Sequence, residues 1–322
     1  MIKVVVGTSV GRGALLEAPA SVSDLSVHAA DGAAELCAAL ADADIAVMTG
    51  TADTYTQEVA AHVGASAALK WIHLMSAGYE GVTQNGFPEG RLLTGPGEGV
   101  STSVAEHAIA LLFALSRGVP QALERQRAGE WDRGFTQDMV TLSGKTLLVA
   151  GFGRIGRKVG ALGKAIGMHV IGVSRSDRPD ECAHEVHTVS DLGELLGRAD
   201  AIVVALPLRA DTASLFDRKA FQRCRPGALF VNVGRGATVD RDALVNALRE
   251  GTLHSAAVDV MTPEPLPAGD PMWHTPRLLI TPHVGGAGDI QALRRMAEEF
   301  VTNIGRFRRG EGLHNLIQQF DH

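Results

Sequence analysis

Three polar residues in constrained surroundings could together reduce a small keto acid. Arg235 lies between two glycines in VNVGRGATVD, Glu264 lies between two prolines in VDVMTPEPLP, and His283 precedes two glycines in LLITPHVGG. Reduction of a 2-oxo acid needs a cation for the substrate carboxylate, a proton donor for the carbonyl oxygen and a hydride. Arg235 would bind the carboxylate, and His283 would donate the proton. Glu264 beside His283 would favour the imidazolium.

Each of these residues, taken alone, also fits a structural role. Arg235 could form a surface ion pair, Glu264 could be an exposed loop carboxylate, and His283 could be a hydrogen-bonded structural histidine. The chemical interpretation therefore depends on the three residues occurring together.

A glycine-rich loop supplies a candidate site for the hydride donor. The segment GFGRIG at 151–156 fits the GxGxxG pattern, follows the apolar run 146–150, and precedes apolar residues at helical spacing. In such loops the first glycine permits a tight turn, the second lets a pyrophosphate approach the backbone, and the third lets the helix pack on the strand. The loop residues predicted to bind a dinucleotide are Gly151, Gly153, Arg154, Ile155 and Gly156. A glycine-rich turn without a ligand is the alternative.

The end of the next predicted strand bears on which dinucleotide would bind. A carboxylate at this place accepts hydrogen bonds from the ribose of NAD, but here the sequence reads Ser174-Arg175-Ser176. Serine removes the repulsion of a 2′-phosphate, and the arginine fork suits a phosphate. The pattern favours NADP(H). NAD(H) would fit if Arg175 pointed to water and Asp177 took the ribose role.

The predicted strands and helices form two doubly wound α/β domains. Apolar runs at 146–150, 169–174, 201–207, 228–234, 255–260 and 277–282 are predicted strands of one sheet. Shorter runs at 2–7, 25–30, 44–50, 71–77 and 91–95 are predicted strands of another. Alternating strands and helices indicate parallel sheets covered on both faces, with ligands at the carboxyl ends of the strands.

The same pattern suggests where the domains meet. The Gly95–Gly97 cluster breaks the first series, and a long helix is predicted from 289 to about Gly310. We expect this helix to pack back on the first domain, so that the chain crosses between domains twice. The expected division is residues 1–98 and 287–322 for the substrate domain and 99–286 for the dinucleotide-binding domain.

Composition excludes several classes of protein. The 322 residues carry a net charge of −6, which argues against nucleic-acid and membrane-surface partners. Cys37, Cys182 and Cys224 form no CxxC pair, so we expect buried free thiols rather than a metal site or disulfides. The most apolar helix candidate, 104–118, contains Glu106 and His107 and is predicted to be too short to span a bilayer. With no visible targeting segment, a cytoplasmic enzyme is expected.

The chain resembles the D-isomer-specific 2-hydroxyacid dehydrogenase family almost end to end. The motifs that carry the resemblance are SAGYEGV, VAEHAIALLFALSR, GFGRIGRKV, LPLRADTASLF, RPGALFVNVGRGATVDRDAL, VDVMTPEPLP, DPMWHTPRLLITPHVGG and NIGRFRRGEGLHN. The resemblance implies a Rossmann dinucleotide-binding domain inserted in a flavodoxin-like substrate domain. It also implies a homodimer joined through the dinucleotide domain, with the apolar 104–117 helix resembling the element involved.

The resemblance also implies individual roles. Arg235 matches the family's substrate-binding arginine, Glu264 its supporting carboxylate and His283 its acid/base. The backbone of Ala77 and Gly78 matches the loop that receives the substrate carboxylate. The remaining cofactor positions that it implies are Asp259, at the nicotinamide amide, together with Leu206, Pro207, Thr212 and Val233.

Serine followed by arginine at 174 and 175 resembles the NADPH-using glyoxylate/hydroxypyruvate reductase branch. This implies reduction of a small 2-oxo acid such as glyoxylate or hydroxypyruvate to the D-2-hydroxy acid. One alternative is an NAD-dependent enzyme acting on another substrate, such as phosphoglycerate. The other is a dinucleotide-sensing protein similar to the corepressors that share the family's Arg, Glu and His. Phosphite and formate oxidation are disfavoured, since those relatives carry lysine in place of Ala77 and glutamine in place of Glu264, respectively.

Overall fold

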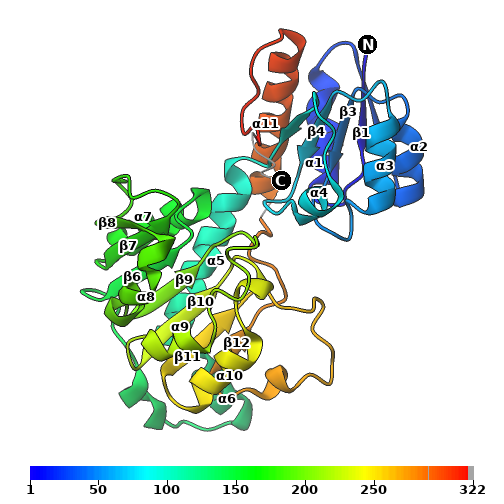
Figure 1. The fold of residues 1–322 in the computed structure, drawn as a ribbon. Coiled ribbons are helices and arrows are strands. Elements are labelled where there is room, and N and C mark those ends of the chain that lie inside the picture. Colours follow the sequence, from blue (N-terminus) through cyan, green and yellow to red (C-terminus); the bar gives the residue numbers. More distant parts are fainter. Residues whose placement is uncertain (289, 318–322) are drawn as a thin grey trace. The chain divides into compact units, whose positions relative to one another are not determined.

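The computed structural model describes residues 1–288 and 290–317, which form two compact units (Figure 1). The first unit comprises Met1–Ser103 with the described residues from Gly286 onwards, and the second comprises Val104–Gly285. Each unit has one sheet in which every paired strand is parallel. The α/β class predicted from the alternating pattern is confirmed.

The first unit has a five-stranded sheet in the order β2-β1-β3-β4-β5. Its strands are β1 (Ile2–Val6), β2 (Leu25–Ala29), β3 (Ile45–Met48), β4 (Trp71–Leu74) and β5 (Leu92–Thr94). Its helices are α1 (Arg12–Glu17), α2 (Ala33–Leu40), α3 (Gln57–Ala65), α4 (Glu80–Asn85) and α11 (Ile290–Arg308), with a 3-10 turn at Ala18–Ser21. This strand order is that of flavodoxin-like sheets.

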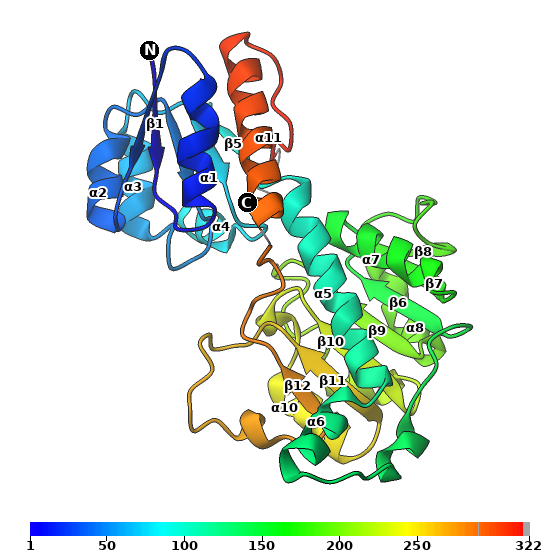
Figure 2. The same ribbon diagram turned by 180° about the vertical axis from the view of Figure 1, so that it is seen from behind.

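Helix α11 returns the chain to the first unit, where it packs against α1 (Figure 2). Its buried residues recur at helical spacing and include Ala292, Met296 and Phe300. The ring of Phe300 lies 5.3 Å from that of Trp71 and 5.0 Å from that of His73, both on β4. The apolar face of α11 is therefore the one that covers the sheet.

His73 is a fully buried titratable group in this core. Trp71 Nε1 donates to Thr94 Oγ1 at 2.8 Å, and the Thr94 hydroxyl is 2.8 Å from His73 Nδ1. If Thr94 donates to Nδ1, the ring hydrogen lies on Nε2, which has no hydrogen-bond partner among the described residues. Burial lowers the pKa of His73 to about 3, so the folded unit holds it neutral.

We therefore expect the stability of the first unit to fall in acid. Below pH 6.5, His73 is protonated in the unfolded chain but stays neutral in the folded chain. Between this pH and the folded pKa of about 3, the free energy of unfolding therefore decreases by up to about 1.4 kcal/mol for each pH unit of acidification. Urea unfolding of the wild type and of His73→Leu, followed by tryptophan fluorescence between about pH 7 and about pH 4.5, measures this difference. Equal pH slopes for the two proteins would rule out His73 as the source.

The second unit has a seven-stranded sheet in the order β12-β11-β10-β9-β6-β7-β8. Its strands are β6 (Thr146–Ala150), β7 (His169–Ser174), β8 (Glu185–Thr188), β9 (Ala201–Val204), β10 (Ala228–Asn232), β11 (Leu253–Val258) and β12 (Leu278–Ile280). Counted from β6, the order is the Rossmann order 3-2-1-4-5-6 with one further strand. Six of these strands were predicted. The edge strand β8 was missed because its sequence, EVHT, is short, polar and only half-buried.

Helices and 3-10 turns connect these strands. The helices are α5 (Glu98–Ser116), α6 (Val119–Ala128), α7 (Arg154–Ala165), α8 (Leu192–Leu195), α9 (Arg218–Arg223) and α10 (Arg241–Arg249). The 3-10 turns span Gly134–Asp138, Val189–Asp191, Leu196–Arg198, Gly236–Thr238 and Pro271–His274. The predicted helix over 104–118 begins earlier, at Glu98, so the prediction that it is too short to span a bilayer was wrong. Among the described residues it is the one helix long and apolar enough for a span, but 61% of its most apolar stretch is buried in the protein, as in a core helix.

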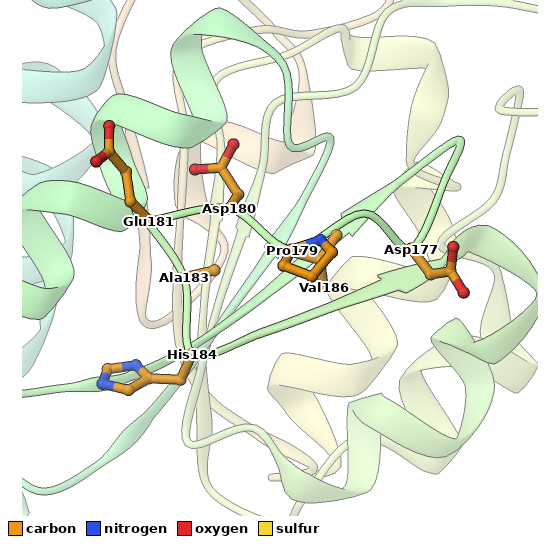
Figure 3. A pocket seen from close by; sticks show the side chains of 7 residues that line it. All are labelled: Asp177, Pro179, Asp180, Glu181, Ala183, His184 and Val186. Atoms are coloured by element: carbon orange, nitrogen blue, oxygen red, sulfur yellow. The ribbon is translucent and has the colours of Figure 1, made fainter.

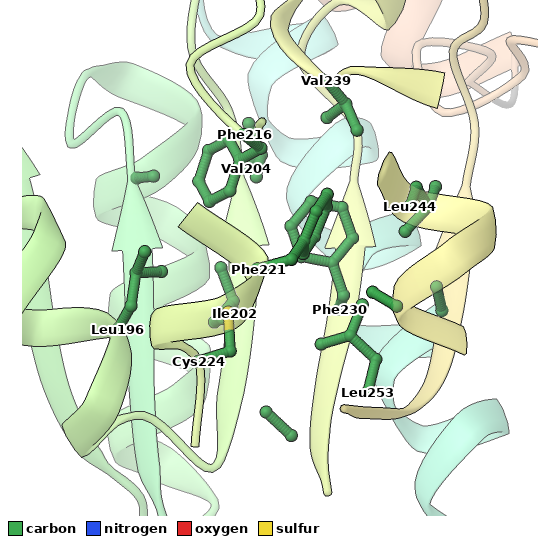
Figure 4. Packing of buried hydrophobic residues seen from close by; sticks show 14 of the residues in the cluster. Leu196, Ile202, Val204, Phe216, Phe221, Cys224, Phe230, Val239, Leu244 and Leu253 are labelled. Atoms are coloured by element: carbon green, nitrogen blue, oxygen red, sulfur yellow. The ribbon is translucent and has the colours of Figure 1, made fainter. Parts of the chain in front are cut away.

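Three phenylalanines form the centre of the core on one face of this sheet (Figure 4). The ring of Phe230, on β10, lies 5.3 Å from those of Phe216 and Phe221 in edge-on contact. Replacing one such buried ring by alanine typically costs about 3–5 kcal/mol. This core holds β9, β10 and β11 in register, and the loops at their carboxyl ends carry the candidate site.

Candidate active site

Glu264 and His283 form a direct pair on the loops that follow β11 and β12, which are neighbouring strands. His283 Nδ1 donates to Glu264 Oε2 at 2.6 Å. The other carboxylate oxygen, Oε1, accepts from the backbone N–H of Met261 at 2.7 Å. A hydrogen bond within its own loop thus helps to orient the Glu264 carboxylate toward His283.

The pair is arranged to carry a proton near neutral pH. The hydrogen bond to Glu264 raises the pKa of His283 above its ordinary value of 6.5, against opposing effects of burial and of Arg235. Burial acts to raise the pKa of Glu264, but the bonds from His283 and the Met261 amide outweigh it and hold this pKa low. The side chains of His283 and Glu264 are 46% and 36% exposed, so their ion pair contributes little to the stability of the fold. We therefore interpret the pair as a candidate for proton transfer rather than as a structural contact.

The backbone of His283 is held in an uncommon conformation. Its φ is +53°, a left-handed value that a non-glycine residue rarely adopts and that costs about 1–3 kcal/mol. The His283 N–H donates to the carbonyls of Asp259, at 2.8 Å, and Thr281, at 3.0 Å. These bonds fix the direction in which the ring leaves the loop.

Arg235 lies on a loop too tight for side chains on either side of it. A Cβ on Gly234 would lie 2.6 Å from the carbonyl oxygen of Leu206, and one on Gly236 would lie 2.2 Å from the carbonyl of Met261. The Arg235 guanidinium donates from Nη1 to the Gly234 carbonyl at 2.6 Å. Its positive charge lowers the pKa of both Glu264 and His283, so the structure brings the three predicted residues together.

Two residues that the sequence analysis missed hold the Arg235 backbone. The carbonyl of Arg235 accepts from Asn232 Nδ2 at 3.1 Å and from Thr238 Oγ1 at 2.6 Å. Asn232 Oδ1 also accepts from the Gly234 N–H at 3.0 Å. Both side chains are buried. A buried asparagine ending an apolar strand was the available signal, because such a side chain must find local hydrogen bonds.

Asp259 is buried, and its carboxylate organises the loop around His283. Oδ1 accepts from Thr281 Oγ1 at 2.6 Å and from the Val284 N–H at 3.0 Å, while Oδ2 accepts from the Gly285 N–H at 2.8 Å. Oδ2 therefore keeps a lone pair for a further donor. The resemblance implied only a cofactor contact for Asp259, and its structural role was not anticipated.

The glycine loop has the geometry that its three glycines require. Gly151 has φ of +98°, and a Cβ on it would lie 2.6 Å from the Ala205 carbonyl. A Cβ on Gly156 would lie 2.1 Å from the Gly151 oxygen. By contrast, a Cβ on Gly153 would meet nothing within 4 Å, and Gly153 caps α7 without a side-chain hydrogen bond. The helix N-terminus at Arg154 and Ile155 thus has an open backbone surface of the kind that binds phosphate.

The serine that replaces the expected acid closes a small turn after β7. Ser174 Oγ donates to the carbonyl of Ser176 at 2.6 Å and accepts from its N–H at 3.2 Å. Arg175 is exposed, and none of the described residues forms an ion pair or hydrogen bond with its side chain. The turn presents the guanidinium to solvent beside the carboxyl end of β7.

A hollow of about 430 Å³ lies along the connection from β7 to β8 (Figure 3). Its lining includes Asp177, Asp180 and Glu181, with the last two on one side and Asp177 on the other. Asp180 also pairs with Arg157 at 2.9 Å. The acidic lining disfavours a phosphate, and the hollow includes none of the three catalytic candidates.

The other predicted cofactor positions lie after β9 and β10. Leu206 and Val233 are buried, and Pro207 is exposed. The hydroxyl of Thr212 donates to the Pro207 carbonyl at 2.7 Å and accepts from the Arg209 N–H at 2.8 Å. The side chain of Thr212 therefore stabilises the conformation of its own loop.

In the first unit, Ala77 and Gly78 follow β4. Ala77 is exposed, and Gly78 is buried. Ser76 Oγ donates to the Gly78 carbonyl at 2.7 Å and accepts from the Gly50 N–H at 2.9 Å, which joins this loop to the one after β3. The loop backbone is thus held by the unit itself.

The cysteines were expected to be buried free thiols. The three cysteines are free, with Cys37 and Cys224 buried and Cys182 partly so. Within residues 1–288 and 290–317, no group of three or more His, Cys, Asp or Glu side chains could hold a metal ion.

The chain is similar to several known proteins. A family model described as "D-isomer specific 2-hydroxyacid dehydrogenase, NAD binding domain" matches residues 109–285. The chain is 31% identical over 258 residues to a glyoxylate reductase of Thermococcus litoralis, covering 78% of this chain and 77% of that protein. It is 33% identical over 287 residues to a D-3-phosphoglycerate dehydrogenase of Methanocaldococcus jannaschii, covering 88% of this chain but only 53% of that protein. The chain thus spans about half the length of that relative.

A solved structure of similar fold contains a dinucleotide. It is a probable 2-hydroxyacid dehydrogenase from Rhizobium etli in complex with NADP, HEPES and L(+)-tartaric acid, with a TM-score of 0.81 and 25% sequence identity. The similarity covers 99% of this chain and 98% of that one.

Proposed function

The chain belongs to the D-isomer-specific 2-hydroxyacid dehydrogenase family, and on that premise we propose that it reduces a small 2-oxo acid, such as glyoxylate or hydroxypyruvate, to the D-2-hydroxy acid. The observation that carries this proposal is the 2.6 Å bond from His283 to Glu264 with the charge of Arg235 beside it. An acid, its supporting carboxylate and a carboxylate-binding cation are the protein groups that the reaction requires.

Each of the three residues has a separate role in the proposed reduction. Arg235 binds the substrate carboxylate through its planar fork. Nδ1 of His283 is occupied by Glu264, which leaves Nε2 to give a proton to the carbonyl oxygen as it becomes a hydroxyl. Glu264 stabilises the imidazolium before the transfer, and in the reverse direction the neutral imidazole takes the proton back. When bound, the reduced dinucleotide supplies the hydride.

The residues present fit a dinucleotide. The open space at Gly153 lets a pyrophosphate approach the N–H groups of Arg154 and Ile155, while Gly151 and Gly156 keep the turn tight. The remaining lone pair of Asp259 Oδ2 can accept an amide N–H. The cofactor's adenosine side would lie along the loops that contain Leu206, Pro207, Thr212 and Val233.

We propose NADP(H) as the preferred cofactor, with NAD(H) as the alternative. The support is the exposed Arg175 beside a Ser174 hydroxyl that carries no charge. Arg175→Ala is then expected to weaken NADPH by about 10- to 100-fold, since a hydrogen bond to a charged group is worth about 1.5–3 kcal/mol, and to change NADH affinity little. Fluorescence titration with both cofactors measures the ratio, and equal weakening would mean that Arg175 does not contact the phosphate.

The activity itself is tested with a panel of 2-oxo acids. Purified protein is mixed with glyoxylate, hydroxypyruvate or 3-phosphohydroxypyruvate and with NADPH or NADH, and absorbance of the reduced cofactor is followed. We expect turnover of the two small acids with NADPH. Preference for the phosphorylated acid with NADH would favour the phosphoglycerate alternative. Cofactor binding without turnover of any acid would favour a dinucleotide-sensing protein.

We propose distinct roles for the two units. The second unit, expected at 99–286, would bind the dinucleotide, and the first, expected at 1–98 and 287–322, would supply substrate contacts. In the first unit the backbone of Ala77 and Gly78 would bind the substrate carboxylate. The proposed function also implies a cytoplasmic enzyme with no nucleic-acid or membrane partner.

We further propose a homodimer joined through the second unit. Phe113 on α5 and Val119 and Leu123 on α6 are exposed apolar residues, and Trp131 after α6 is 97% exposed. Leu123→Glu is expected to shift the protein to monomers at micromolar concentration, because burying an unpaired carboxylate is costly. Sedimentation velocity measures the shift, with the exposed neighbouring substitution Glu124→Gln as control. A monomeric wild type would contradict the proposal.

A further inference from the structure

His107 joins helix α5 to the loop that carries His283. Its Nε2 lies 3.0 Å from Thr281 Oγ1 and 3.2 Å from Asp259 Oδ1, although 174 residues separate it from Thr281. Its neighbour Glu106 is exposed, whereas the His107 side chain is only 21% exposed. The contact therefore exists only because the fold brings α5 against the carboxyl ends of β11 and β12.

The hydrogen positions in this contact follow from its partners. Thr281 Oγ1 donates its one hydrogen to Asp259 Oδ1 at 2.6 Å, so toward His107 the hydroxyl oxygen can only accept. The Asp259 carboxylate also only accepts. Nε2 of His107 must therefore carry a hydrogen and donate it toward both oxygens.

Through Asp259 this donor reaches both sides of the catalytic histidine. The carboxylate binds Thr281, two residues before His283, and the N–H groups of Val284 and Gly285 immediately after it. The Asp259 carbonyl holds the N–H of His283 itself at 2.8 Å. Hydrogen bonds to Asp259 thus hold the backbone of His283 in its positive-φ conformation.

Gly285, Asp259 and His107 pack closely together in this network. A Cβ on Gly285 would lie 2.8 Å from Asp259 Oδ2 and 3.2 Å from Cδ2 of His107. With Asp259 only 3% exposed, water can do little to replace a lost donor. Removing the His107 N–H would free one side of a buried carboxylate and let it turn.

We infer that His107 is a positioning residue for the reaction: its Nε2–H anchors Asp259 and Thr281 and thereby sets the orientation of the His283 ring toward substrate. This inference rests on the proposed function, in which His283 is the acid. His107 touches neither substrate nor reacting atoms, so it acts through the loop. Misplacement of a reacting group by about 1 Å can cost about 100-fold in rate.

The test compares side chains that keep or remove the donor. His107→Leu removes it, His107→Gln retains an N–H near the Nε2 position, and Glu106→Gln is a control on the same helix. Thr281→Val and Thr281→Ser form a second pair, which serves if His107→Leu does not fold. For each variant, kcat and KM for the 2-oxo acid, the cofactor Kd and the thermal midpoint are measured.

We expect His107→Leu and Thr281→Val to lower kcat by about 10- to 100-fold, with KM changed by less than about threefold. His107→Gln and Thr281→Ser should recover most of kcat, and Glu106→Gln should match the wild type. A His107→Leu enzyme within about twofold of the wild type, or a His107→Gln enzyme as slow as His107→Leu, would overturn the inference.

A second readout does not depend on turnover. NMR titration of the His283 imidazole, which Glu264, Asp259 and Arg235 surround electrostatically, reports whether its pair with Glu264 is intact. In His107→Leu we expect the His283 pKa to fall toward 6.5, its ordinary value, and in His107→Gln to stay raised. If the wild type reduces no 2-oxo acid, the proposed function is wrong. The titration still tests whether the His107 N–H holds the loop that carries His283. An unchanged His283 pKa in His107→Leu would overturn the inference.

Discussion

Replacing His283 with alanine should slow reduction of the 2-oxo acid by about 10²- to 10⁴-fold while leaving the cofactor Kd nearly unchanged. The reason is that the imidazole is the proton donor, whereas the glycine loop that would bind the dinucleotide belongs to other strands of the sheet. Steady-state kinetics and fluorescence titration of the reduced cofactor measure the two quantities. A loss of cofactor affinity as large as the loss of rate would contradict the acid role.

The pH profile gives this prediction its control. Because the reaction needs the imidazolium, kcat/KM for reduction should be constant in acid and fall about tenfold per pH unit above the pKa of His283. Glu264 is the largest cause that raises this pKa, so Glu264→Gln should move the fall to lower pH. If the pH at which kcat/KM falls is the same in Glu264→Gln and in the wild type, a group other than His283 would be the proton donor whose titration sets the profile.

Replacing Arg235 with alanine should lower kcat/KM for the 2-oxo acid by about 10²- to 10⁴-fold, because two hydrogen bonds to a charged carboxylate are lost and each is worth about 1.5–3 kcal/mol. We expect much of the loss to appear as a higher KM. The guanidinium also lowers the pKa of His283, so its removal should move the pH profile of the residual activity upward. Steady-state kinetics at several pH values separate these effects.

Two controls distinguish carboxylate binding from a general effect on the loop. Arg235→Lys keeps the charge but loses the planar fork, so its kcat/KM should fall between those of the wild type and of Arg235→Ala. An aldehyde without a carboxylate should be reduced about equally slowly by the wild type and by Arg235→Ala. If Arg235→Ala slows the aldehyde as strongly as the 2-oxo acid, Arg235 does not act on the carboxylate.

Much of the architecture was readable because apolar strands and glycine turns are local signals. Runs such as 146–150 can only be buried, and Gly151 has the positive φ that its place in the motif requires. The edge strand β8 was missed because half of an edge strand faces solvent and its pattern is polar. Helix α5 was predicted too short because its first turn contains glycine and serine, which propensity alone does not assign to a helix.

The sequence by itself determined the chemistry available: an arginine between glycines, a glutamate between prolines and a histidine after a strand, each at a carboxyl strand end. Only the tertiary structure decided how these groups are held. The bond between Glu264 and His283, the four donors around Asp259 and the approach of His107 all join residues far apart in the chain. Such contacts depend on which strands are neighbours in the sheet and on where α5 lies against them, and neither is encoded in local spacing.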